Sequence, residues 1–166
     1  MRALIVGGGR RGLALATDLT SEGHAVRYVT RDVSRRAEIE AVGAEVWPGD
    51  PDRVGTLRYA LDNVTLLLWL LGTATGDPER VAALHGSRLE MMLERTVDTT
   101  VRGVVYEAAG TLPPEVYEAG IREMRRANER NEVPYRVLAV DPADEESWQE
   151  GAREAIFSLL EPRSME

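Results

Sequence analysis

Short apolar runs alternate with amphipathic segments along the whole chain, and no other feature restricts the fold as strongly. The apolar runs predict strands at residues 2–6, 25–29, 44–47, 64–70, 101–106 and 134–140. The segments between them have helical spacing and predict helices at residues 12–22, 34–42, 51–61, 78–97, 113–130 and 144–160. Strands that alternate with helices form parallel sheets with right-handed crossovers. The sequence therefore predicts an α/β fold: a doubly wound, six-stranded parallel sheet with helices on both faces.

The chain is expected to form a single domain over residues 1–166. Its length of 166 residues is typical of one domain, and no internal repeat or linker-like stretch divides it. Residues 78–97 form either one long helix or two helices that meet near Gly86. The acidic run at residues 141–146 is expected to cap the last helix.

Composition excludes several classes of function. The net charge of −8 argues against nucleic acid as the main partner, because phosphate binding depends on positive charge. The chain has no cysteine, and His24 and His85 have no paired acids at ligand spacing, so we expect neither disulfides nor a metal site. The longest apolar run, residues 66–71, is too short to cross a bilayer, and no targeting signal precedes the first strand. These features predict a soluble protein of the cytoplasm.

Residues 7–12 read GGGRRG and match the pattern G-x-G-x-x-G between the first predicted strand and the first predicted helix. In this context the pattern predicts a dinucleotide-binding turn. Gly7 allows the tight turn, Gly9 lets backbone amides approach a pyrophosphate, and Gly12 lets the helix pack closely on the strand. The amino end of the helix adds unpaired N–H groups and partial positive charge. The alternative is a glycine-rich turn that binds no ligand.

The residues at the end of the second strand indicate which dinucleotide is bound. NAD-binding proteins place an acid there for the adenosine ribose hydroxyls. This chain has Thr30, Arg31 and Asp32, and the Arg31 guanidinium can bind a 2′-phosphate. Arg10 and Arg11 can add charge at the same edge, so we expect NADP(H) rather than NAD(H). Two alternatives stay open: Asp32 is the ribose acid if the register shifts by one residue, or Arg31 is a solvated surface charge.

These segments resemble the short-chain dehydrogenase/reductase superfamily, in its atypical and extended branches with an NAD(P)-binding Rossmann domain. The resemblance covers residues 1–76 and extends loosely to the fifth and sixth strands. The matching segments are the glycine turn, residues 23–32 and the Gly49-Asp50 pair. The resemblance implies that Asp50 accepts a hydrogen bond from the adenine amine. It also implies that the segment of Leu71, Gly72 and Thr73 passes under the nicotinamide ribose.

The catalytic residues of that family are missing from this chain. Extended members have the pattern G-x-x-G-x-x-G, whose first glycine would fall at Val6. Residues 106–110, YEAAG, lack the family's serine or threonine, and the Tyr-x-x-x-Lys pair has no counterpart because all 20 basic residues are arginine. In that chemistry the lysine lowers the pKa of the tyrosine from about 10. Tyr117 stands near the expected place and is interpreted as core-facing, beside Ile121 and Met124.

Glu107 is the best candidate for an unusual catalytic acid or base, or for a contact to the nicotinamide carboxamide. It ends a predicted central strand, where doubly wound sheets present functional side chains. A solvent-facing loop acid is an equal alternative. About one helix follows the sixth strand, where extended members add a substrate lobe, so a pocket over the nicotinamide is expected from the loops at 72–78 and 107–114 or from another chain.

A homodimer is a further hypothesis. The helices expected at 87–97 and 114–130 are equivalent to those that form a four-helix dimer interface in the resembled family, although such stripes usually cover the sheet. Their apolar residues are Leu89, Met92, Leu93, Val116, Ile121 and Met124.

Three functions stay open at the level of the sequence. The first is a small NADP(H)-dependent oxidoreductase, in which the nicotinamide supplies hydride to a carbonyl-type substrate. The second is a non-catalytic dinucleotide sensor or regulator, which the missing tyrosine–lysine pair favours. The third is a structural relic that binds nothing, since a fold does not by itself define a function.

Overall fold

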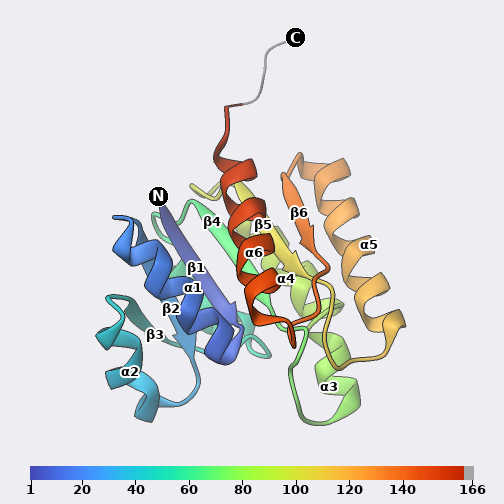
Figure 1. The fold of residues 1–166 in the computed structure, drawn as a ribbon. Helices are drawn as coiled ribbons and strands as arrows, with labels where there is room; N and C mark the ends of the chain where they lie inside the picture. Colours follow the sequence, from blue (N-terminus) through green and yellow to red (C-terminus); the bar gives the residue numbers. More distant parts are fainter. Residues whose placement is uncertain (163–166) are drawn as a thin grey trace.

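A computed structural model describes residues 1–162 as a parallel sheet between two layers of helices (Figure 1). The strands are β1 (Arg2–Gly7), β2 (Ala25–Thr30), β3 (Glu45–Pro48), β4 (Leu66–Leu70), β5 (Gly103–Glu107) and β6 (Tyr135–Leu138). The helices are α1 (Gly9–Ser21), α2 (Arg36–Ala41), α3 (Pro78–Ala83), α4 (Ser87–Thr96), α5 (Pro114–Asn131) and α6 (Glu145–Leu160), and the 3-10 turns are η1 (Val33–Arg35), η2 (Val54–Leu57) and η3 (Tyr59–Leu61).

The strand order confirms the doubly wound topology. The sheet runs β3-β2-β1-β4-β5-β6, and all five pairings are parallel. The order reverses between β1 and β4, so the connections on either side of this pair pass over opposite faces. In such sheets a crevice opens at the carboxyl ends of the strands at this reversal. Figure 1 shows these ends together, at the bottom of the view.

Two apolar clusters hold the helices on the sheet. One joins the sheet to α1, α2 and α6, and the other joins it to η2, η3, α4, α5 and the C-cap of α3. Every residue of β4 is buried, as expected for a central strand with both faces covered. The Trp69 indole, near the carboxyl end of β4, donates to the backbone oxygen of Leu84 at 2.9 Å and so ties the strand to the end of α3.

One helical segment differs from expectation, and a second follows one of its two expected alternatives. Residues 51–61 contain no α-helix but two 3-10 turns, η2 and η3. The hydroxyl of Thr56 accepts from the amide of Asp50 and donates to backbone oxygens of Asp50 and Arg53, and these contacts favour turns over a continuous helix. Residues 78–97 form the two helices α3 and α4, with Gly86 as the N-cap of α4.

Most apolar residues on α4 and α5 pack into the core of the same chain. Leu89, Met92, Leu93 and Met124 are buried in the core beneath these helices. Of the residues named for a dimer interface, Val116 and Ile121 are the two that stay partly exposed. The homodimer stays a prediction.

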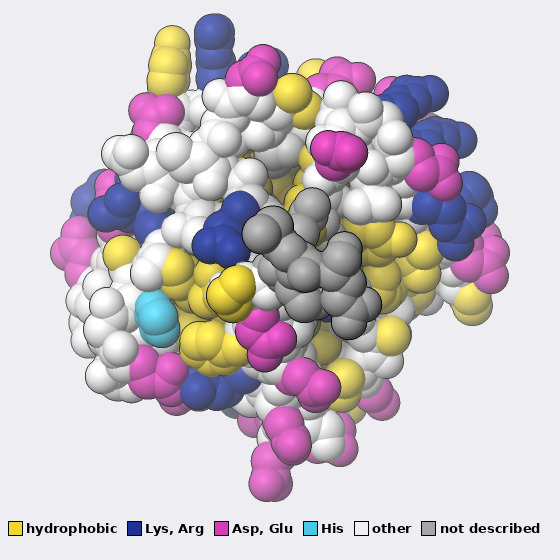
Figure 2. Space-filling view, turned by 90° about the horizontal axis from the view of Figure 1, so that it is seen from above, with side chains coloured by type: hydrophobic (Ala, Val, Ile, Leu, Met, Phe, Trp, Pro, Cys, Tyr) yellow, Lys and Arg dark blue, Asp and Glu magenta, His cyan; other side chains and the backbone are white. Residues whose placement is uncertain are grey.

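The surface of the described residues carries charges of both signs. Figure 2 views the molecule from the end where the strands begin, and it shows arginine and acidic side chains around the rim, with the larger apolar areas toward the middle. No helix of residues 1–162 is both long and apolar enough to span a membrane. These residues also contain no cluster of three potential metal ligands among histidine, aspartate and glutamate.

The close contact of α5 with β5 predicts a clear packing effect. A Cβ at Gly120 would overlap the Tyr106 hydroxyl and would lie 2.9 Å from Cε1 of the same ring. We therefore expect Gly120→Ala to destabilise the fold by about 1–3 kcal/mol in urea denaturation, the usual cost of overpacking. Gly55→Ala is the control, because a Cβ at Gly55 meets no atom within 4 Å. Equal stability of the two variants would contradict the prediction.

Candidate functional site

A cleft of about 510 Å³ lies at the carboxyl ends of β1 to β4, at the reversal of strand order. The glycine turn after β1 forms one part of its wall. The ends of β2 and β3, the loop after β4 and helix α3 form the rest. Among the residues predicted to bind cofactor, those that line the cleft are Gly7, Gly9, Thr30, Arg31, Asp32, Asp50, Leu71 and Thr73.

The glycine turn has a backbone that other residues rarely adopt. Gly7, Gly8 and Gly9 all have positive φ, at 86°, 83° and 50°. The Tyr28 hydroxyl, from the neighbouring strand β2, hydrogen-bonds the backbone oxygens of Gly7 and Gly9 at 3.1 and 3.0 Å. A Cβ at Gly12 would lie only 2.8 Å from this hydroxyl, so Gly12 permits the close approach of α1 that the sequence predicted.

The end of β2 brings two arginines to the cleft. Arg31 lies on the wall as predicted, and Arg35 of η1 joins it. The Arg35 guanidinium lies 5.7 Å from the centre of the Tyr28 ring, and its Nε donates to Glu38. Arg35 was missed at the level of the sequence, because nothing in the chain order of residues 33–38 shows which of the arginines turns back toward the strand. Its place in the first turn after β2 is the signal that was present.

The two acids predicted at the adenosine end are held by local hydrogen bonds. Asp32 accepts from the amide of Ser34 at 2.9 Å, and hydrogen bonding from Ser34 lowers the pKa of the Asp32 carboxyl. Asp50 accepts from the amide of Asp52 at 2.9 Å. Both carboxyls line the cleft, so the position of Asp32 leaves the NAD alternative open.

The loop after β4 is fixed on its far side by three side chains. Glu107 accepts from the Gly72 amide at 2.7 Å, the Tyr117 hydroxyl donates to the Gly72 oxygen at 2.7 Å, and His85 Nε2 lies 3.0 Å from the Leu71 oxygen. Gly72 faces this network and does not line the cleft, while Leu71 and Thr73 do. The backbone oxygen of Ala109 leaves no room for a Cβ at Gly72.

Tyr117 is not the core-facing residue that the sequence suggested. Its hydroxyl lies between two backbone groups, donating to Gly72 and accepting from the amide of Leu112 at 3.0 Å. It therefore joins the loop after β4 to the segment before α5. The hydroxyl thus already acts as both donor and acceptor, and Tyr117 is not among the residues that line the cleft.

Three expectations about the cleft are corrected. Glu107 is neither a solvent-facing acid nor part of the wall: it is 0% exposed, and both carboxylate oxygens have partners. Arg10 and Arg11 do not reach the β2 edge, because Arg10 pairs with Glu145 of α6 and Arg11 turns toward Glu107 and Thr73. The loop at 107–114 adds no lining residue, and Arg80, Val81 and Leu84 of α3 and its C-cap lie there instead.

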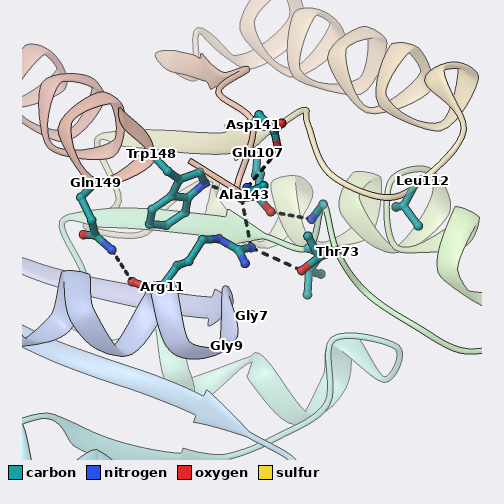
Figure 3. A network of polar contacts seen from close by, with 12 residues as sticks. Gly7, Gly9, Arg11, Thr73, Glu107, Leu112, Asp141, Ala143, Trp148 and Gln149 are labelled. Carbon is teal, nitrogen blue, oxygen red and sulfur yellow. Dashed lines mark hydrogen bonds and ion pairs between the residues drawn. The ribbon is translucent and has the colours of Figure 1, made fainter. Parts of the chain in front are cut away.

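The buried network beneath the loop is shown in Figure 3. The Arg11 guanidinium lies between the Glu107 carboxylate and the Thr73 hydroxyl, and Trp148 of α6 closes the network on the other side. Burial raises the pKa of Glu107, while hydrogen bonds from Trp148 and Gly72 and the charge of Arg11 oppose this rise.

His85 gives a pH dependence that can be measured. Leu71 offers only a carbonyl oxygen, so His85 Nε2 donates to it and Nδ1 accepts from the Tyr106 hydroxyl at 2.6 Å. This arrangement needs the neutral ring, and burial lowers the pKa of His85 below its ordinary value of 6.5. The unfolded chain then binds a proton more readily than the folded chain, so stability falls as the pH drops below the unfolded value.

We expect the free energy of unfolding to decrease with acidification by up to about 1.4 kcal/mol per pH unit, the limit for one proton. Urea denaturation at a series of pH values from about 7 to 5 measures this slope. The slope should vanish in His85→Gln, and the same series on His24→Gln assigns it to one of the two histidines. A slope that survives in His85→Gln would show that other groups cause it.

Comparison with solved structures shows the fold that the chain shares. The UDP-glucuronic acid 4-epimerase from Bacillus cereus in complex with NAD superposes with a TM-score of 0.69 at 12% identity, over 85% of this chain and 57% of the epimerase. The UDP-glucose 4-epimerase from Thermotoga maritima gives 0.68 at 15% identity, over 83% and 54%. The triphenylmethane reductase from Citrobacter sp., complexed with NADP(H), gives 0.62 at 20% identity, over 82% and 48%.

These likenesses confirm the Rossmann-type fold, which the chain shares with these structures. The chain spans about half the length of the structures that it matches. No protein-family model matches the sequence. No curated protein matches it either.

Proposed function

We propose that the cleft binds a nicotinamide adenine dinucleotide, with the pyrophosphate at the glycine turn and the adenosine at the ends of β2 and β3. The open amino end of α1 carries this proposal. Its N-cap is Gly8, no side chain caps the helix, and the first turn contains no acidic residue. The N–H groups of a first helical turn lack intrahelical acceptors and attract phosphate. The likeness in fold to structures with bound NAD or NADP(H) supports the same ligand class.

We further propose a preference for NADP(H). Arg31 and Arg35 both line the cleft after β2, where the adenosine ribose of a bound dinucleotide would lie. Two guanidiniums favour a 2′-phosphate, which accepts charge-assisted hydrogen bonds in a fork. Asp32 at the same edge opposes this charge, but one of its oxygens already accepts from Ser34.

Titration of the protein with NADPH and NADH tests both parts of the proposal. We expect NADPH to bind more tightly, and Arg31→Ala or Arg35→Ala to weaken NADPH by about 10- to 100-fold, which matches one charge-assisted contact of about 1.5–3 kcal/mol. NADH should change by less than about 2-fold, since it lacks the 2′-phosphate. Arg58→Ala is the control, because Arg58 is exposed and lies outside the cleft. Equal losses for the two ligands would refute the role of the arginines, and binding of neither ligand by the unaltered protein would refute the site.

Whether the bound cofactor reacts is a separate question. In an oxidoreductase of this kind the nicotinamide supplies hydride, and the chain only orients it toward a small-molecule substrate such as a carbonyl compound. One observation favours the second candidate, a non-catalytic dinucleotide sensor. The residues that line the cleft include no tyrosine, histidine, serine or glutamate within the described chain, so aspartate is the only common general acid or base among them.

Oxidation of NADPH in the presence of carbonyl and quinone acceptors separates the two candidates. Turnover above the rate without protein supports the oxidoreductase. Tight binding without turnover of any acceptor supports the sensor.

A further inference from the structure

Glu107 joins four elements at one buried point beneath the cleft. It ends β5 and contacts Gly72 in the loop after β4, Arg11 in α1 and Trp148 in α6 (Figure 3). The separations in sequence run from 35 to 96 residues, so no local pattern creates this cluster. The carboxylate is 0% exposed, and the Arg11 side chain is 15% exposed.

The hydrogen bonds of the Glu107 carboxylate are divided between its two oxygens. Oε1 accepts from the Gly72 amide at 2.7 Å, and Oε2 accepts from the Trp148 indole nitrogen at 2.7 Å. Arg11 Nη2 lies 3.5 Å from the same Oε2 and donates to the Thr73 hydroxyl at 3.3 Å. The guanidinium also lies 5.2 Å from the centre of the Trp148 ring. The network therefore holds Gly72 directly and Thr73 through Arg11.

The loop that this network holds lies on the nicotinamide side of the cleft. The pyrophosphate of a bound dinucleotide lies at the turn after β1 and the adenosine ribose at the end of β2. The other half of the cofactor must then extend over β4, on the opposite side of β1. Leu71 and Thr73 line the cleft there.

We propose that Glu107 is a positioning residue: through Gly72, and through Arg11 to Thr73, it sets the loop after β4 at the place where the nicotinamide half of the cofactor binds. The inference rests on the proposed function, because it requires a dinucleotide in the cleft. It assigns Arg11 a role different from contact with phosphate. It also predicts that a substitution in the network weakens binding of the nicotinamide half of the cofactor and leaves binding of the adenosine half unchanged.

The chemistry of glutamine makes the network testable. The amide side chain introduced by Glu107→Gln would have one acceptor oxygen and one nitrogen donor, where the native carboxylate offers an acceptor to both Gly72 and Trp148. In this variant one of these two N–H groups therefore faces another donor. In the double variant with Trp148→Phe the competing indole donor is gone, so the amide oxygen can turn to Gly72. The second substitution should thus restore part of what the first one loses.

The experiment compares NADPH with adenosine 2′,5′-bisphosphate, which offers phosphates to the glycine turn and to the β2 edge but has no nicotinamide half. We expect Glu107→Gln to weaken NADPH at least 10-fold and the bisphosphate less than 2-fold, and the double variant to recover at least 3-fold of the NADPH affinity. Arg11→Met should show the same selective loss, and it serves if Glu107→Gln does not fold. Arg153→Met is the control, because its contact with Glu22 also joins α6 to the end of α1, away from the cleft.

The outcomes separate this inference from the proposed function. Selective loss of NADPH with recovery in the double variant supports the positioning role. Equal weakening of both ligands, unchanged NADPH binding, or no recovery would overturn it while the binding site stands. If the unaltered protein binds neither ligand, the proposed function itself fails and this inference fails with it.

Discussion

Gly7→Ala should destabilise the protein by more than about 3 kcal/mol and abolish dinucleotide binding. Gly7 has φ of 86°, where a Cβ costs about 1–2 kcal/mol. The added atom would also overlap the backbone oxygen of Leu70 and lie 2.6 Å from Cδ2 of Leu71. Gly7 and Leu70 form the last pair between the two central strands, β1 and β4, so a shift of either backbone would disturb the end of this ladder. Overpacking of this kind adds about 1–3 kcal/mol.

Gly23→Ala is a matched control for this prediction. Gly23 has nearly the same φ, 89°, but a Cβ there meets no atom within 4 Å. It therefore carries the conformational cost without the overlap. Urea denaturation of both variants and titration with NADPH measure the two effects. If Gly7→Ala is no less stable than Gly23→Ala, the close approach of β4 is not what requires a glycine at this position.

Glu107→Leu should destabilise the fold by about 3–6 kcal/mol. The leucine is similar in size but accepts no hydrogen bond, so the Gly72 amide and the Trp148 indole nitrogen lose their acceptors in a buried place. Each buried donor without a partner costs about 1–3 kcal/mol. The Arg11 guanidinium loses its carboxylate as well. This loss is a large share of the roughly 5–15 kcal/mol that stabilises a typical domain.

Chemical denaturation measures this effect, and Glu40→Leu is the control. Glu40 pairs with Arg36 on the exposed side of α2, at i and i+4, where such a pair contributes about 0.3–0.5 kcal/mol. A loss below about 1 kcal/mol in Glu107→Leu would contradict the prediction, because it would mean that the two N–H groups find other acceptors.

Most of the fold could be predicted because its signals are local. All six strands lie within three residues of their predicted ends, and the glycines at 23, 43 and 86 mark the ends or beginnings of helices as expected. The prediction of a helix at residues 51–61 was wrong, because the apolar residues of this segment repeat at a spacing that fits two short turns as well as a helix. Side-chain contacts of Thr56 decide between these two, and spacing alone does not report them.

In the candidate site too, the features that depend on near neighbours in the chain could be predicted, and those that depend on distant contacts could not. The glycine turn, Arg31, Asp32 and Asp50 reach the cleft, because each closely follows a strand of a parallel sheet and strand ends converge at one edge. The direction in which a long side chain points could not be predicted from its place in the chain. Arg11 turns inward and Arg10 outward to Glu145, although both stand in the same turn.

The order of strands and helices and the glycine turn were determined by the sequence alone, since hydrophobic period and backbone freedom act between near neighbours. The buried place of Glu107, the clamp of Tyr117 and His85 on the loop after β4, and the part that α3 takes in the cleft were decided only by the tertiary structure. The reason is physical: a carboxylate, a hydroxyl or an imidazole is directed by the partners that satisfy it. The hydrogen bonds of Glu107, Tyr117 and His85 to Gly72, Trp148 and Leu71 span 14 to 45 residues of the chain.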